Sequence, residues 1–286
     1  MKTDGNRAGG LANSTRNPGT SSRAHSRAVW RVGACLLAWI GLAVCSFAQT
    51  TNVWTDNFES PTVWDNWSVD NGVWEIGKPL TGPPIVGGYR AHEGTNCAAT
   101  VLNGNYPAST SSRLIRSLPF VVPSASQNPR LQFWHWYQFA GSSYGVVQIK
   151  YGTNPWTDLS PRYYTTGSGV WTRPVVDLSA YAGKAVQIAF QIVADGNIAD
   201  GWDVDQVSVV KGPYIVGFTN GATESFESGF GDWYAETGTW EVGVPTSGPG
   251  GAHSGINCLA TVLGGNYEDD RSSRFISPAF VVPSAD

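Results

Sequence analysis

Acidic side chains cluster near both ends of the segment 52–211, and their type suits a metal ion. They are Asp56, Glu59, Asp200, Asp203 and Asp205. If the first and last strands of this segment are neighbours, the carboxylates converge, and hard oxygen ligands of this kind suit Ca²⁺. The alternative is a group of solvated carboxylates in which Asp205 holds a turn by hydrogen bonds. For a structural calcium we expect Glu59 and Asp205 as the main ligands, with Asp203 and Asp56 beside them.

Tryptophan side chains are the second group that could bind a ligand. Trp134 and Trp136 alternate with Phe133 and Tyr137 in one apolar segment, so the two pairs face opposite sides of a strand. Aromatic rings stack on sugar rings, but tryptophans on strands also fill sandwich cores. We therefore take Trp134 and Trp136 as the candidate ligand surface and expect Phe133 and Tyr137 to be buried.

The residues that could do catalysis are few. The segment 141–145 carries the G-x-S-x-G pattern, which presents a nucleophilic serine when a strand feeds a helix. Here it lies between two expected strands, where its glycines suit a hairpin loop. His135 shares the expected core face of its strand, so a hydrogen-bonded core histidine is the first interpretation and a ligand or base is the alternative. His92 and His253 occupy matching loop positions, which favours structure. We expect no catalytic residue and no organic cofactor.

Composition and charge limit the partners. The 286 residues include 34 Gly, 17 Pro and 13 Trp, with 41% hydrophobic and 14% charged, as in globular modules joined by tight turns. Residues 1–49 hold six basic side chains and one acid, so the remainder carries 12 basic and 21 acidic groups, a formal charge of −9. Nucleic acid needs clustered Lys and Arg, so we expect no nucleic acid partner.

The first 48 residues have the pattern of a signal peptide. A basic start precedes 13 apolar residues, 32–44, and the small-x-small site Ser46-Phe47-Ala48. A membrane anchor is the weaker alternative, because about 20 apolar residues are needed to span a bilayer. We expect cleavage after Ala48, a secreted or cell-surface protein, and no membrane span in the mature chain.

The rest of the sequence is an internal repeat. Four segments recur in order: 58–60 as 226–228, 73–77 as 239–243, 96–102 as 257–263, and 120–125 as 280–285. Trp67 and Trp74 are matched by Trp233 and Trp240, which favours a core role for all four. We expect a complete domain at 52–211, a linker at 212–221, and a truncated second copy at 222–286 that is poorly ordered or marginally stable alone.

The mature chain retains one cysteine in each repeat. They are Cys97 and Cys258, at matching positions. A disulfide framework needs an even number within each folding unit, so we expect two small buried thiols, with a bridge between them as the alternative.

Hydrophobic periodicity predicts an all-β fold. Val147, Ile149 and Tyr151 alternate with polar residues, and the segment 186–192 alternates in the same way. A period of two is typical of strands with one buried face, and Gly, Pro and Asn-rich breakers separate the runs. We expect an antiparallel two-sheet jelly-roll sandwich, concanavalin-like, present as one complete copy and a truncated second one.

An ordered string of motifs resembles the MAM-like jelly-roll modules. The string is Phe58-Glu59, Trp67, Gly82-Pro83, Leu131-x-Phe133-Trp134-His135, 171–178 with Ala182-Gly183, and Gly201-Trp202-x-Val204-Asp205. It looks closest to the bacterial choice-of-anchor J and cleaved-adhesin type, and to modules attached to immune-inhibitor-A-like secreted peptidases. The resemblance covers about 52–211 and part of 222–286.

This resemblance implies a function. Such modules serve in adhesion or accessory binding, often with a calcium that would map onto Glu59 and Asp205, echoed by Glu227. The conserved cysteine pairs of animal MAM domains are missing here. We expect a non-catalytic adhesion or binding module with an extracellular glycan or protein ligand. The alternatives are a carbohydrate-binding module of a larger secreted enzyme and an accessory domain of a secreted metallopeptidase.

Overall fold

The computed structural model describes residues 49–85, 88, 90–164, 167–214, 223–235, 237–267, 269 and 272–280. The expected signal peptide 1–48, most of the linker and residues 281–286 lie outside these ranges. Inside them, the helical segments are three 3-10 turns, Val63–Asp65, Ala125–Gln127 and Ser179–Tyr181. None of the helical segments described is long and apolar enough to cross a membrane.

The first sheet joins the two ends of copy one. Its order is β10 (Val175–Asp177), β7 (Arg130–Gln138), β12 (Gly201–Lys211), β4 (Cys97–Ala99) and β3 (Glu75–Gly77), with β1 (Thr51–Asp56) also paired to β12. All of these pairs are antiparallel. Since β1 lies beside β12, the first and last strands of copy one are neighbours, as expected.

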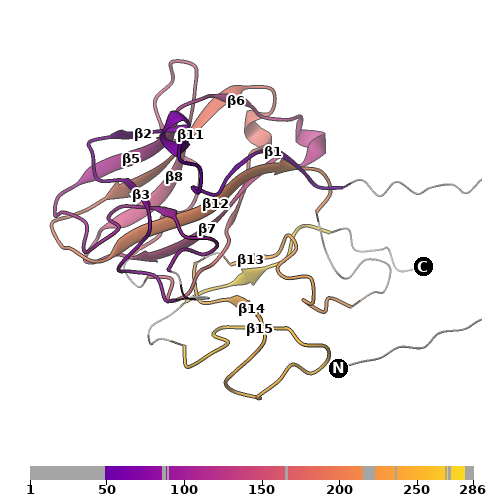
Figure 1. Ribbon diagram of the computed structural model, residues 1–286. Helices are drawn as coiled ribbons and strands as arrows, with labels where there is room; N and C mark the ends of the chain where they lie inside the picture. Colours follow the sequence, from indigo (N-terminus) through magenta and orange to yellow (C-terminus); the bar gives the residue numbers. More distant parts are fainter. Residues whose placement is uncertain are drawn as a thin grey trace, which may run out of the picture. The chain divides into compact units, whose positions relative to one another are not determined.

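The second sheet packs against the first. Its order is β2 (Trp67–Asp70), β5 (Ser111–Arg116), β11 (Ala185–Val193), β8 (Tyr144–Tyr151) and β9 (Thr157–Asp158), with β6 (Phe120–Val121) also paired to β11. Figure 1 shows these strands as one layer and the strands β1, β12, β7 and β3 as the other. The fold of copy one is the antiparallel two-sheet sandwich that the sequence predicts.

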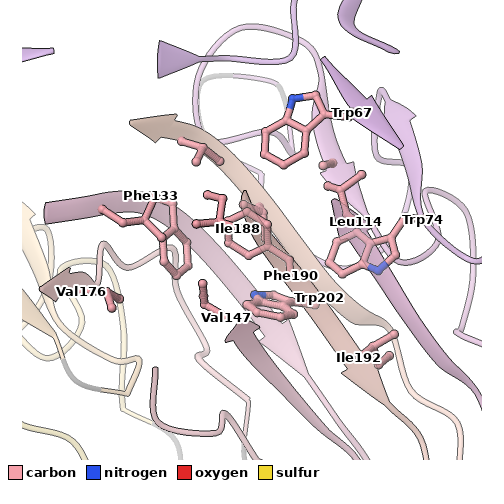
Figure 2. Packing of buried hydrophobic residues seen from close by; sticks show 14 of the residues in the cluster. Trp67, Trp74, Leu114, Phe133, Val147, Val176, Ile188, Phe190, Ile192 and Trp202 are labelled. Carbon is pink, nitrogen blue, oxygen red and sulfur yellow. The ribbon is translucent and has the colours of Figure 1, made fainter. Parts of the chain in front are cut away.

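The core lies between the two sheets. Val147 of β8 pairs with Phe190 of β11, and Ile149 pairs with Ile188, and all four side chains are fully buried. Trp202 of β12 lies beside Val147 and Phe190 in Figure 2, with its ring centroid 5.6 Å from that of Phe190. Alternation therefore places one face of each strand in the core, as predicted.

The repeated tryptophans of copy one are core residues too. Trp67 is 2% exposed and Trp74 is 4% exposed, which confirms the prediction made from their recurrence. The ring of Trp74 lies 5.8 Å from that of Trp202 (Figure 2). Large aromatic side chains thus carry much of the apolar area that holds the two sheets together.

Copy two repeats the local pairing of copy one. Its described strands are β13 (Tyr234–Ala235) with β16 (Phe275–Ile276), and β14 (Glu241–Gly243) with β15 (Cys258–Ala260). Gly243 lies opposite Cys258, just as Gly77 lies opposite Cys97. Both thiols are free; Cys97 is buried and Cys258 is half-buried. The marginal stability of 222–286 stays a prediction.

Candidate functional site

The outer face of the first sheet carries the candidate residues, and a loop covers part of it. Trp136 is only 5% exposed, in a second apolar cluster with Ala91, Cys97, Ala99 and Trp171. A Cβ on Gly82 would lie 3.2 Å from its ring. Trp136 is therefore wrong as a ligand surface. It points away from the core, as alternation predicts, but Gly82 and Ala91 lie against it.

Trp134 keeps a partly open position on the same face. His92 stacks on its ring with centroids 3.7 Å apart and planes 14° apart. Phe230 of copy two meets it edge-on at 5.2 Å. Phe133 and Tyr137, its neighbours along β7, are buried in the core as predicted.

Three of the predicted metal ligands approach one short segment, 93–97. Glu59 Oε1 accepts hydrogen bonds from the backbone N–H groups of Thr95 and Asn96, at 2.6 and 2.7 Å. Asp205 Oδ2 accepts from the Glu93 N–H at 3.1 Å, and Asp203 Oδ1 accepts from the Cys97 thiol at 3.5 Å. The fold therefore brings Glu59, Asp203 and Asp205 together.

Asp56 has different partners. Its Oδ1 accepts from the Phe58 N–H at 3.0 Å, and its Oδ2 accepts from the Trp67 indole at 3.0 Å. This carboxylate therefore ties the end of β1 to a core tryptophan. Among the described residues, no three His, Cys, Asp or Glu side chains are arranged so that they could hold a metal ion.

Burial shifts the pKa values of these acids. Desolvation, opposed by backbone hydrogen bonds and assisted by the charge of Glu59, raises the pKa of Asp205 to about 7. Asp203 is fully buried, and desolvation raises its pKa well above the usual range. Desolvation and the neighbouring carboxylates also raise the pKa of the Cys97 thiol. A negative charge is therefore unfavourable at this cluster unless a cation or a proton compensates it.

Two positive φ angles flank the cluster. Phe58, just before Glu59, has φ of 59°, and Gln206, just after Asp205, has φ of 47°. Gln206 lies in a bulge, where the register between β12 and β7 shifts between Asp205 and Ser208. Non-glycine residues rarely adopt this conformation, and bulges re-aim side chains. The bulge turns Asp205 toward the loop and leaves Gln206 facing a groove.

This groove adjoins the acidic cluster and has a volume of about 560 Å³. Its lining is polar except for one ring. It comprises Asn52, Thr55, Asp56, Asn57, Ser60, Asn66, Gln132, Trp134, Arg173, Gln206 and Ser208. Most of these side chains come from β1, β7 and β12, on the face turned away from the core.

Arg173 is the cation of the groove. Arg173 was not among the predicted site residues, because nothing in its local sequence sets it apart. Its Nε is buried without a hydrogen-bond partner among the described residues. Desolvation lowers its pKa to about 10, so the guanidinium remains charged at neutral pH.

The two catalytic candidates are enclosed. Ser143 is fully buried in the loop between β7 and β8, and its hydroxyl donates to Asp195 Oδ1 at 2.9 Å. The expected hairpin is wrong, because β7 and β8 belong to different sheets and the loop connects the two layers. His135 is fully buried, and its Nδ1 accepts from the Trp202 indole at 3.3 Å. Desolvation lowers the pKa of His135 to about 3. His135 is a hydrogen-bonded core histidine, as the sequence indicated.

Comparison with known proteins gives one sequence relative. Bacillopeptidase F of Bacillus subtilis (strain 168) is 33% identical over 140 residues, which is 48% of this chain. The chain covers only 9% of the length of this relative. No protein-family model matches the chain.

Solved structures with a similar fold include two binding domains. The K3 cleaved adhesin domain of Lys-gingipain from Porphyromonas gingivalis w83 is 18% identical, with a TM-score of 0.34 over 57% of this chain and 99% of that one. The CBM22-1 xylan-binding domain from Paenibacillus barcinonensis Xyn10C is 9% identical, with a TM-score of 0.39 over 56% of this chain and 94% of that one.

Proposed function

We propose that the chain is a non-catalytic binding module of a secreted or cell-surface protein, and that its ligand is an extracellular glycan bound in the groove of the first sheet. The main support for this proposal is the chemistry of the side chains that line the groove. Its amide and hydroxyl groups both donate and accept hydrogen bonds, which suits a ligand covered with hydroxyl groups. Trp134 adds an apolar ring edge at which a sugar can pack.

The absence of catalysis is part of the proposal. Two observations support it: Ser143 and His135 are both fully buried, and the Ser143 hydroxyl and His135 Nδ1 each form a hydrogen bond inside the protein. A nucleophile or base must reach its substrate within hydrogen-bond distance. Neither side chain offers that access.

A second candidate function for the whole protein is that of a secreted peptidase to which this chain belongs. The likeness to Bacillopeptidase F favours it, because that relative is a peptidase and the matched part is a small share of its length. In this case the chain is an accessory domain that binds a glycan or protein near the peptidase's substrate. Membership of the MAM-like modules, and an adhesive role toward a protein ligand, stay predictions alongside it.

The binding proposal is tested by screening the chain against an array of extracellular polysaccharides. We expect binding to at least one of them, and about tenfold weaker binding for Trp134→Ala because a ring contact is lost. Ser208→Arg fills the groove while Trp134 stays in the chain, and it should weaken binding as much. Tyr164→Ala removes an exposed ring outside the groove and serves as the control. Full binding by both groove variants, or no binding by the unaltered chain, contradicts the proposal.

We also propose a structural calcium held by Glu59 and Asp205, with Asp203 nearby. Two features support it: the carboxylates approach the same segment, and the charge of Glu59 helps to raise the pKa of Asp205 as that of Asp205 helps to raise the pKa of Asp203, which a cation would reverse. Bound calcium would supply a fixed positive charge beside these carboxylates.

Thermal melting with a chelator and with added calcium tests this second proposal. At a calcium concentration about 100 times the Kd, the folded state gains roughly 2.7 kcal/mol, so Tm rises by several degrees. Glu59→Gln should abolish the rise. Glu227→Gln makes the matching change in copy two and should keep it. A Tm that does not respond to either addition rules calcium out.

A further inference from the structure

Arg130 is an arginine with no exposure to solvent, although it stands on the outer face of the first sheet. Its charge is neutralised by copy two. NH2 of Arg130 donates to both carboxylate oxygens of Asp232, at 2.8 and 2.9 Å, and Nε donates to Oδ1 at 3.0 Å. The exposed fractions of the two side chains are 0% and 2%. This is a two-pronged ion pair sealed between the copies, which belong to one compact unit, 47–286.

The same guanidinium holds the start of the linker. Arg130 NH1 donates to the carbonyls of Asn128 at 3.0 Å and Gly212 at 3.1 Å, and NH2 also reaches the carbonyl of Pro213 at 3.4 Å. The Gly212 N–H donates to the Gln127 carbonyl at 2.6 Å. Residues 212 and 213 are therefore held against copy one.

Further contacts surround the ion pair. Gln132 Nε2 donates to Asp232 Oδ1 at 2.8 Å, and the Thr239 N–H donates to the Ser168 carbonyl at 3.0 Å. Gly238 lies so close that a Cβ there would be 2.4 Å from Ser168 Cα. The backbone of copy two is thus in direct contact with copy one.

Asp232 is specific to copy two. The match of Trp67 with Trp233 aligns Asp232 with Asn66, so the repeat itself does not require an acid at this position. In copy one, Asn66 lines the groove instead. Copy two thus has a carboxylate at the position where it contacts the buried Arg130, and copy one does not. This difference indicates that Asp232 serves the contact between the copies.

The burial of this ion pair determines how much it contributes to the contact between the copies. An exposed ion pair contributes little, but two buried charges are tolerated only when their geometry and hydrogen bonding are good. We infer that copy two docks at a single site on the outer face of the first sheet, with Asp232 bound by Arg130 and Gln132. Tandem copies then form a rigid pair, and any ligand sites they carry have a fixed spacing. This inference does not depend on the ligand.

The test uses Asp232→Ala in the full chain, with small-angle scattering and hydrogen exchange at the Thr239 amide. Loss of the buried pair should speed exchange at Thr239 by about a hundredfold or more and increase the maximum dimension of the particle. Asp269→Ala removes an exposed acid of copy two and is the matched control. Amides of β8 and β11 should keep their protection, which shows that copy one remains folded.

A second variant keeps Asp232 and so guards against misfolding of copy two. Gln132→Ala removes one of the hydrogen bonds to Asp232 and should speed exchange at Thr239 by about tenfold. Unchanged exchange and scattering in both variants overturn the inference. So does an unaltered chain whose scattering already fits two separate bodies.

Discussion

Copy one and copy two form the same local contacts but bury them to different degrees. Asp56 accepts hydrogen bonds from the N–H of Phe58 and the indole of Trp67, both at 3.0 Å. Glu224 accepts from the N–H of Phe226 at 3.0 Å and from the indole of Trp233 at 3.1 Å. The repeat therefore encodes this motif locally, and either acid can supply it.

The glutamate of the Phe-Glu-Ser motif behaves in the same way. Glu227 Oε1 accepts from the N–H groups of Ile256 and Asn257, both at 2.9 Å, as Glu59 does from Thr95 and Asn96. A Cβ at Gly255 would lie 2.3 Å from Glu227 Oε1. Since both copies have this clasp, it is a structural element of the repeat, whatever else Glu59 does.

Burial separates the two copies. In copy one, the ribbons β2–β5 and β3–β4 are joined by strands of residues 130–211, which bury Cys97 and Trp67. In the described part of copy two, the matching ribbons are separate two-stranded sheets, and Cys258 and Trp233 are only half-buried. Local motifs therefore determine how neighbouring strands pair, whereas strands from distant parts of the chain determine how deeply the side chains are buried.

Truncating the matched tryptophans should give the largest contrast. Trp74→Ala removes a side chain packed against Trp202 and should lower the free energy of unfolding of copy one by about 3 to 5 kcal/mol. Trp240→Ala should lower that of copy two by roughly 1 kcal/mol, because its ring is half-buried. Denaturant unfolding followed by peptide-resolved hydrogen exchange separates the two copies. Equal losses would mean that copy two has a core as complete as that of copy one.

The reactivity of the two thiols should give the second-largest contrast between the copies. Cys97 is fully buried and its pKa is raised, chiefly by desolvation, so it reacts only after local opening. We expect alkylation of Cys258 to be about a hundredfold faster at neutral pH. Mass spectrometry of labelled peptides measures both rates in one sample. Guanidinium at an unfolding concentration should equalise them, and similar rates without it would contradict the burial of Cys97.

The pH dependence of copy one should give the smallest effect. The pKa of Asp205 is about 7 in the folded state and about 3.9 when unfolded, so the folded state holds this proton more tightly. Its contribution to stability is therefore full below about pH 4 and is lost as the pH rises through 7. The upper limit is about 4 kcal/mol, and we expect roughly 1 to 2.

The measurement compares the unaltered chain with Asp205→Asn between pH 4.5 and 7.5, in the presence of chelator. The unaltered chain should lose more stability over this range. His92 and His135 act in the opposite direction, since desolvation lowers their pKa values to about 4 and about 3. They are present in both chains and cancel in the difference. Parallel curves would mean that the pKa of Asp205 is not raised in the folded state.

The sequence predicted the framework well. Alternation along β8 and β11 identified the buried face, and recurrence identified Trp67 and Trp74 as core residues. It also placed the G-x-S-x-G segment in a loop between two strands, although that loop connects the two sheets and is not the hairpin that was expected. These features depend on neighbours within one strand or one turn, so a linear pattern contains them.

Three features of the outer face depend on parts of the chain that no local pattern connects. Gly82 and Ala91 lie against Trp136, the β12 bulge aims Asp205 and Gln206, and Arg130 meets Asp232 across 102 positions. The two-residue period of the hydrophobic pattern by itself determined which side chains point away from the core. Only the tertiary structure decided what meets them there, because that depends on which distant segments the folded backbone brings over the same face.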